Sequence, residues 1–193
     1  MKMYKPWELP ESLRVGQKEW PIRSDFCTAL DCMVVLEADD LDEAEKAEFV
    51  CRILYPNWQE IFESGCFQEA VEAAYSFLDG ERPKKTKEEA AADPKGRVMS
   101  WTEDAAMIFD AINKRRQIDV RKEKPHWWTF LGYYLEIDES LFSTVLSLRQ
   151  KQRDGKKLDK YEKEFVAKNP QYFRQGREDM HMEEAEELMK LFG

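Results

Sequence analysis

The stretch SDFCTALDCMVVLEADD, residues 24–40, decides the fold class of this chain. Its apolar side chains recur at three- and four-residue steps, as in Phe26, Leu30 and Met33, and this is the period of one helix face. Asp25 or the serine before it is a suitable N-cap, and the stretch Ala38-Asp39-Asp40-Leu41 ends the pattern. The sequence therefore predicts an amphipathic helix at this point.

The same period recurs along the chain in segments bounded by capping residues, prolines or glycines. Asp42 with Glu45, and Ser100 with Glu103, have the spacing of a capping box. The glycine at position 80 follows a predicted helix end, where glycine is favoured. Residues 56–62 are expected to form a short turn. Further helices are expected, in chain order, at residues 42–55, 70–78, 100–116, 125–135, 138–149, 158–167 and 182–192.

The segment before the first helix has a different period. Residues 13–15 and 19–22 alternate apolar and polar side chains on either side of Gly16, which predicts a β-hairpin. Pro21 restricts the second arm to an edge position, and a two-stranded ribbon needs helices to pack against. We expect a mainly α fold, a helical bundle in two packed halves with a short N-terminal β-hairpin.

The domain organisation follows from a change in composition. Residues 81–96 contain no large apolar side chain, so they cannot bury enough surface to offset the entropy of ordering the chain. Their charges are of mixed sign, which favours a solvated linker over a targeting motif. We predict an N-terminal hairpin with helices, a mobile charged linker, a C-terminal helical half with an aromatic core and an acidic helical tail, at residues 1–80, 81–97, 98–170 and 171–193.

Residues 125–135 form the densest aromatic stretch of the chain. Neighbouring positions on a helix point in different directions, so only one or two of these rings can line a pocket, and core packing is favoured over ligand stacking. The last predicted helix is either an accessory contact or a terminal helix docked on its own domain. The candidate partner-binding residues are Trp127, Trp128, Phe130, Leu188, Met189 and Phe192. The candidate core residues are Trp20, Phe26, Leu30, Phe109, Phe142 and Leu146.

The side chains that usually perform catalysis are sparse. The sequence has two histidines: His126 has no cysteine or carboxylate nearby at metal-ligand spacing, and His181 lies with Glu183 and Glu184 in a solvated tail. Nucleotide-binding and hydrolase motifs are missing from the sequence. The four cysteines lie among apolar helical positions, which favours packing over metal or redox chemistry. We therefore expect a protein that is not an enzyme and needs no cofactor and no metal.

Net charge and hydropathy argue against nucleic acid and membranes as the main partners. The 193 residues carry a net charge of −9, which argues against a protein whose main task is to coat nucleic acid. The longest apolar runs are far shorter than the roughly 20 residues that span a bilayer, so a protein of the cytosol is expected. A basic stretch at residues 149–163 leaves a DNA-associated or regulatory role open as the alternative, but interleaved acids favour a solvated or partner-facing helix.

The order of motifs is similar to that of a known phage family. The blocks VGQKEWPIRSDF (15–26), LYP (54–56), QIDV (117–120) and HWWTF (126–130), with residues 142–149, resemble the bacteriophage "gene product fifteen" family over about residues 9–170. Two departures are the Ser100-Trp101 helix entry, which we interpret as a packing variation, and the acidic tail, which lies beyond the resemblance.

The resemblance implies a role in tail assembly. Genes of this family lie between the tail-tube and tape-measure genes of long, non-contractile-tailed phages and prophages of Gram-positive bacteria, the position of tail-assembly chaperones. A member would bind tape-measure protein, tail-tube protein or both in the host cytoplasm and be absent from the mature virion. The resemblance leaves open the oligomeric state, the partner surface and a frameshifted fusion product.

Overall fold

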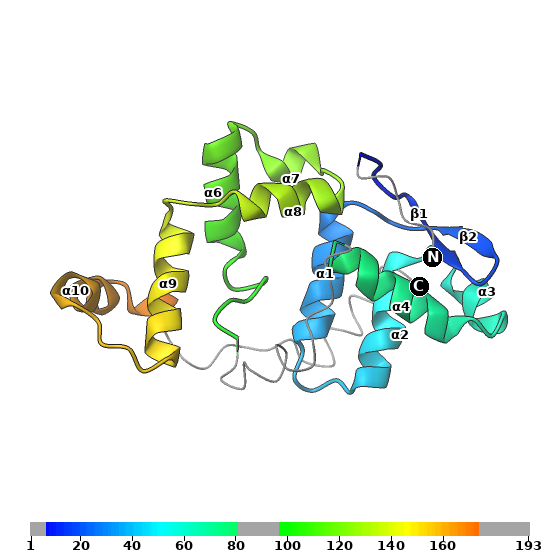
Figure 1. Cartoon of the computed structure of the whole chain (residues 1–193), viewed down its shortest axis with the longest axis horizontal. Coiled ribbons are helices and arrows are strands. Elements are labelled where there is room, and N and C mark those ends of the chain that lie inside the picture. The colour runs from blue at the N-terminus through cyan, green and yellow to red at the C-terminus, as the bar shows by residue number, and fades with distance from the viewer. Residues whose placement is uncertain (1–6, 81–96, 174–193) are drawn as a thin grey trace. The chain divides into compact units, whose positions relative to one another are not determined.

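The computed structural model describes residues 7–80 and 97–173, and these residues are mainly α-helical with one N-terminal hairpin (Figure 1). The predicted fold class is thereby confirmed. The chain divides into two compact units. Within the described residues, the first unit comprises 7–80 and 124–132, and the second comprises 97–123 and 133–173.

The hairpin opens the first unit. Strands β1 (Ser12–Val15) and β2 (Lys18–Pro21) pair antiparallel, with Leu13 opposite Trp20. Leu13 and Trp20 are buried, so one face of the ribbon lies in the core, where β1 packs against helix α4. Gly16 adopts a φ of +62° in the turn, a conformation that favours glycine. The hairpin prediction is confirmed.

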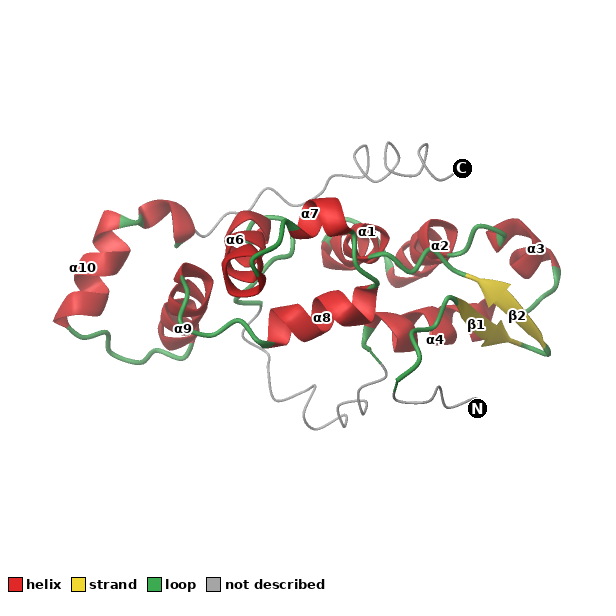
Figure 2. Cartoon of the chain, turned by 90° about the horizontal axis from the view of Figure 1, so that it is seen from above, coloured by secondary structure: helices red, strands yellow, loops and turns green. Residues whose placement is uncertain are grey.

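Helices α1 (Phe26–Glu37) and α2 (Glu43–Leu54) lie side by side in the first unit (Figure 2). Asp25 caps α1 by accepting hydrogen bonds from the Cys27 and Thr28 amides. Asp42 and Glu45 form the predicted capping box of α2. The guanidinium of Arg23 donates to the Ile53 carbonyl over 2.6 Å, which satisfies a carbonyl at the end of α2.

Two further helices complete the sequence up to residue 80. Residues 56–62, expected as a turn, overlap the short helix α3 (Trp58–Glu63), and α4 (Phe67–Leu78) follows it. Ile61 anchors α3 in the core, and Gly80 ends α4 with a φ of +68°. The buried face of α4 includes Ala70, Ala74 and Phe77.

A segment distant in sequence belongs to this first unit. Residues 124–132 lie within the half that we expected to run from 98 to 170. The Phe26 amide donates to the Pro125 carbonyl over 3.0 Å, and the Trp127 amide donates to the Ser24 carbonyl over 2.8 Å. These backbone bonds place the start of helix α8 (Trp127–Leu135) against the start of α1, while residues 133–135 of α8 group with the second unit.

The second unit contains α6 (Ala105–Arg116), α7 (Val120–Glu123), α9 (Leu141–Arg153), α10 (Lys160–Lys168) and the 3-10 turn η1 (Pro170–Tyr172). Helix α6 packs against α7 and α9. The core of the second unit includes Ile108 and Ile112 from α6, and Val145 and Leu148 from α9. Ser140 and Ser143 form a capping box at the start of α9.

The start of α6 differs from the prediction. Residues 101–104 form turns, and the helix begins at Ala105. The Glu103 amide does donate to Ser100 Oγ over 3.4 Å, and the Ser100 amide donates to Asp104 Oδ2 over 3.0 Å. The prediction that Ser100 and Glu103 cap this helix is therefore wrong, because α6 begins at Ala105 and its N-cap is Asp104.

Three of the candidate core residues are buried, namely Trp20, Phe26 and Phe142. Leu30, Phe109 and Leu146 are partly exposed. For Phe109 a charged neighbour covers the ring, since the Arg121 guanidinium lies 4.6 Å from its centroid.

Several predictions fall on residues outside the described ranges. They are most of the linker, the acidic tail from residue 174 onward and, within that tail, Leu188, Met189 and Phe192. Within residues 7–80 and 97–173, no helix combines the length and the apolar character needed to cross a bilayer.

Candidate partner-binding surface

Trp127 and Trp128 close the end of helix α4. The Trp127 indole donates from Nε1 to the Leu78 carbonyl over 2.9 Å, and the Trp128 indole donates to the Phe77 carbonyl over 2.9 Å. Carbonyls in the last turn of a helix have no partner in a following turn, and these two adjacent indoles donate to two of them. The Phe77 carbonyl also accepts from the Gly80 amide over 3.0 Å. Trp127 is completely buried, and Trp128 is half-buried.

Phe130 extends this packing into the core. Its ring stacks on Phe26 with a centroid separation of 4.7 Å and on Trp127 with a separation of 5.7 Å. Both Phe130 and Trp127 have no exposed surface. The described structure therefore gives these two candidate residues a packing role and leaves only Trp128, in part, at the surface.

His126 holds the N-terminal segment to the same region. Its Nε2 lies 3.0 Å from the Pro10 carbonyl, and its Nδ1 lies 3.1 Å from the Trp128 amide nitrogen. An amide can only donate, so Nδ1 accepts, and the ring proton belongs on Nε2, where it donates to Pro10. Burial lowers the pKa of this imidazole, opposed by the bond to Pro10. The neutral ring satisfies both contacts.

Asp31 is the one described carboxyl whose pKa is raised. It lies on α1 at a partly exposed position, and burial, assisted by the nearby charge of Asp25, raises its pKa to about 6. The buried thiols of Cys32 and Cys51 also have raised pKa values, about 12 for Cys51, because burial disfavours the thiolate. In the described ranges, no three His, Cys, Asp or Glu side chains are grouped so as to hold a metal ion.

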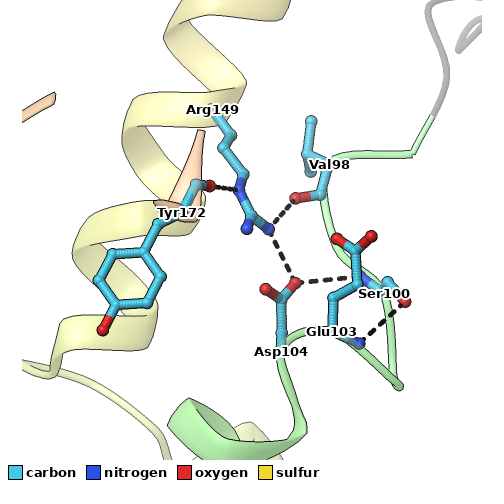
Figure 3. Close-up of polar contacts among 6 residues, drawn as sticks. All are labelled: Val98, Ser100, Glu103, Asp104, Arg149 and Tyr172. Atoms are coloured by element: carbon cyan, nitrogen blue, oxygen red, sulfur yellow. Dashed lines mark hydrogen bonds and ion pairs between the residues drawn. The ribbon is translucent and has the colours of Figure 1, made fainter. Parts of the chain in front are cut away.

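An ion pair between Arg149 and Asp104 organises the second unit (Figure 3). Arg149 Nη1 lies 2.8 Å from Asp104 Oδ2, and the Arg149 guanidinium also donates to the Val98 and Tyr172 carbonyls over 3.1 and 2.8 Å. The two charged side chains are only 13% and 1% exposed. Ser100 donates its amide to the same carboxylate oxygen. The pair joins the segment before α6, helix α9 and the end of η1.

The basic stretch at residues 149–163 is largely neutralised by its own neighbours. Lys151 pairs with Glu162, and Arg153 and Lys156 both pair with Asp154. Together with Arg149, which pairs with Asp104, four of the seven Lys and Arg side chains in residues 149–163 therefore face carboxylates. The other three are exposed, and they are Lys157, Lys160 and Lys163. Such pairing reduces the positive potential available to a phosphate backbone.

A different group of aromatic rings lies at the surface of the first unit. Trp58 and Phe62 on α3 are 6.3 Å apart, and Phe67 at the start of α4 is 5.8 Å from Phe62. Phe62 is 57% exposed, and Trp58 and Phe67 are partly exposed. We call these three rings the α3–α4 aromatic surface.

Sequence reasoning missed this surface, although a signal was present. Ile61 and Phe62 are adjacent on a short helix, so both cannot point into the same core, and the structure buries Ile61. Because residues 56–62 were expected to form a turn, the four-residue spacing that places Trp58 and Phe62 on one helix face was not considered. The described structure thus has a group of contacting aromatic rings at the surface of the first unit, at a place that aromatic density did not indicate.

Comparison with known proteins gives one positive finding. Searches of the curated proteins and of the solved structures found no match for the chain. A family model described as Bacteriophage Gp15 protein matches residues 7–174, which is most of the chain. The resemblance inferred from the sequence motifs is confirmed, and the chain belongs to the Bacteriophage Gp15 protein family.

Proposed function

We propose that this phage protein is a non-catalytic tail-assembly chaperone that binds the tape-measure protein, the tail-tube protein or both while a long tail is built. The observation that carries the proposal is the α3–α4 aromatic surface, which lies exposed on a well-packed unit of a phage-family protein. Exposed apolar patches often mark protein interaction sites. The family resemblance supplies the tail-assembly context.

The proposed mechanism is shielding. A tail protein exposes apolar helix faces before it assembles, and an exposed aromatic surface covers part of such a face. The net charge of −9 keeps the loaded complex in solution by mutual repulsion between complexes. No bond is made or broken, so the proposal needs no cofactor. It places the protein in the host cytoplasm and outside the mature virion.

The proposal is tested by co-expression of the full chain with the tape-measure or tail-tube protein of the same phage. We expect the chain to raise the soluble yield of at least one of them and to retain it in a pull-down. Mass spectrometry of purified virions should find the tail proteins without this chain. Failure to retain either tail protein would overturn the proposed function.

The alternative, a DNA-associated role, predicts a different result. The exposed Lys157, Lys160 and Lys163 would then hold the chain on a DNA column, and retention would decrease steeply with added salt. We expect the chain to pass through such a column at moderate salt.

A further inference from the structure

We propose that the α3–α4 aromatic surface is the docking site for a basic amphipathic helix of the partner protein. This inference rests on the proposed chaperone function and specifies the chemistry of the bound segment. The occupant is a helix with an apolar stripe flanked by Lys or Arg. The geometry of three rings and the charge around them both point to this occupant.

The rings form one continuous apolar area. Trp58 and Phe62 are four residues apart on α3, so they project from the same helix face, and Phe67 approaches Phe62 edge-on at 70°. Single exposed apolar side chains are common on protein surfaces, but three rings connected through Phe62 are a larger target. Aromatic side chains also dominate the binding energy of many interfaces.

The surface is held in place before any partner arrives. Ile61 anchors α3 in the core, and the Arg52 guanidinium lies 4.9 Å from the Trp58 ring centroid. The hairpin turn packs against the start of α4, since the Gly16 amide donates to Glu69 over 2.8 Å. A preformed surface loses little conformational entropy on binding, which favours affinity.

The charge around the rings selects the partner. Residues 53–80 contain five acidic residues and no Lys or Arg. The Arg52 guanidinium beside Trp58 is paired with Glu48, whose Oε1 lies 3.7 Å from Arg52 Nη1, so it does not reverse the negative charge near the rings. Glu60 and Glu63 lie on α3 with the rings, and both are exposed. Lys18 is 3.7 Å from Glu60 and offsets part of its charge, whereas Glu63 adds its charge at the end of α3. A partner helix with basic flanks would therefore gain attraction at the rim.

The same charge argues against two other occupants. A second copy of the chain carries the same net charge of −9, so pairing two such surfaces brings acids together. The chain's own residues 174–193 contain six acidic and three basic residues, so that segment is also of the wrong sign. Docking of an amphipathic helix through spaced apolar anchors is an established mode of peptide recognition and fits a small aromatic surface.

A direct test uses the full chain and a labelled helical peptide of about 18 residues, with Leu at helical spacing and Lys elsewhere. A matched peptide carries Glu in place of every Lys. Fluorescence anisotropy measures both affinities. We expect the Lys peptide to bind and the Glu peptide not to bind, and added salt should weaken binding. Equal binding of the two peptides would overturn the inference.

Variants locate the binding site. Phe62→Ala should weaken the Lys peptide by about tenfold, the usual size of an aromatic hot-spot effect. The matched control is Tyr161→Ala, because Tyr161 is an exposed aromatic residue of the second unit, at 80%. It should leave the affinity unchanged. Glu63→Lys should weaken the Lys peptide and strengthen the Glu peptide. Equal effects of the Phe62 and Tyr161 variants would overturn the inference.

The pull-down separates this inference from the proposed function. If the unmodified chain and the Phe62→Ala variant retain a tail protein equally, the docking site is wrong and the chaperone role stands. If the Lys peptide binds at Phe62 but neither tail protein is retained, the surface is supported and the chaperone role is wrong. Sedimentation that shows a dimer of the full chain dissociated by Phe62→Ala would assign the surface to a second copy and overturn the inference.

Discussion

Two aromatic regions of the first unit have opposite environments. Residues 124–132 bring Trp127 and Phe130 into the core, where they have no exposed surface, whereas Phe62 on α3 is more than half exposed. The first region is the richer in aromatic residues, but its indoles are committed to carbonyls of α4. The comparison teaches that a high density of aromatic residues in the sequence indicates core packing. Whether a single ring is exposed depends on the side chains that surround it in the folded protein.

The largest effect on stability is expected for a substitution in the buried aromatic region. Trp127→Ala should destabilise the protein by about 3 to 5 kcal/mol, because it removes a buried ring, a stacking partner of Phe130 and the donor to Leu78. Chemical denaturation gives the free energy of unfolding. A change below that range would show that the ring is not part of a close-packed core.

A smaller effect separates the hydrogen bond from the ring. Trp128→Phe keeps an aromatic side chain but removes the Nε1 donor to the Phe77 carbonyl. The expected loss is about 1 kcal/mol, the usual net value of one hydrogen bond. Denaturation midpoints of the variant and of Trp128→Ala, which also loses the ring, separate the two contributions.

Asp31→Asn is expected to stabilise the protein near neutral pH by about 1 kcal/mol, an amount discounted because the carboxyl is partly exposed. The folded protein raises the pKa of Asp31 to about 6, so folding is opposed wherever the carboxylate is ionised. The opposition is absent below the unfolded pKa of about 4 and complete above about 6. The advantage of the variant in unfolding free energy should therefore disappear as the pH falls through this window.

His126 should act in the other direction, with a smaller effect that appears at mildly acidic pH. Its pKa is lowered in the folded state, so the unfolded chain binds the proton more readily. The neutral ring's contribution is fully present above about pH 6.5 and is lost as the pH falls. Unfolding titrations in the Asp31→Asn background isolate this slope, and an NMR titration of the imidazole measures the pKa directly. A pKa above that of a free histidine would contradict the neutral ring bonded to Pro10 and Trp128.

The smallest effect on stability is expected for a substitution in the α3–α4 aromatic surface. Phe62→Ala should change the free energy of unfolding by about 0.5 kcal/mol or less, because surface positions contribute little to stability. Thermal denaturation against Trp127→Ala provides the contrast. A loss comparable to that of Trp127 would place Phe62 in the core and remove the basis of the docking site.

Local signals in the sequence were sufficient for much of the fold. The hairpin around Gly16, the Asp25 cap and the Asp42 capping box each depend on residues within a few positions of one another. Such interactions leave a pattern that a reader of the sequence can detect.

The remaining features depend on residues far apart in the chain. Asp104 pairs with Arg149 across 45 positions, and this pair determines how the segment before α6 is held. The bonds of Ser24 and Phe26 to the start of α8 assign residues 124–132 to the first unit. Hydrophobic period and motif spacing do not reveal contacts between residues so far apart. We therefore expected residues 124–132 in the C-terminal half, whereas they group with the first unit. The exposure of Phe62 was hidden for the related reason that burial is decided by all of its neighbours together.

The indole donors at the end of α4 also set a condition on synthesis. The Leu78 carbonyl receives its indole from a residue 49 positions later, so a nascent chain that has reached only position 80 lacks both that donor and the Phe130 ring that stacks on Phe26. Non-local contacts of this kind slow folding, because a long loop must close before they form. The first unit therefore completes its native contacts only after much of the second unit's sequence has left the ribosome, and a chain released early would expose the apolar residues that α8 covers.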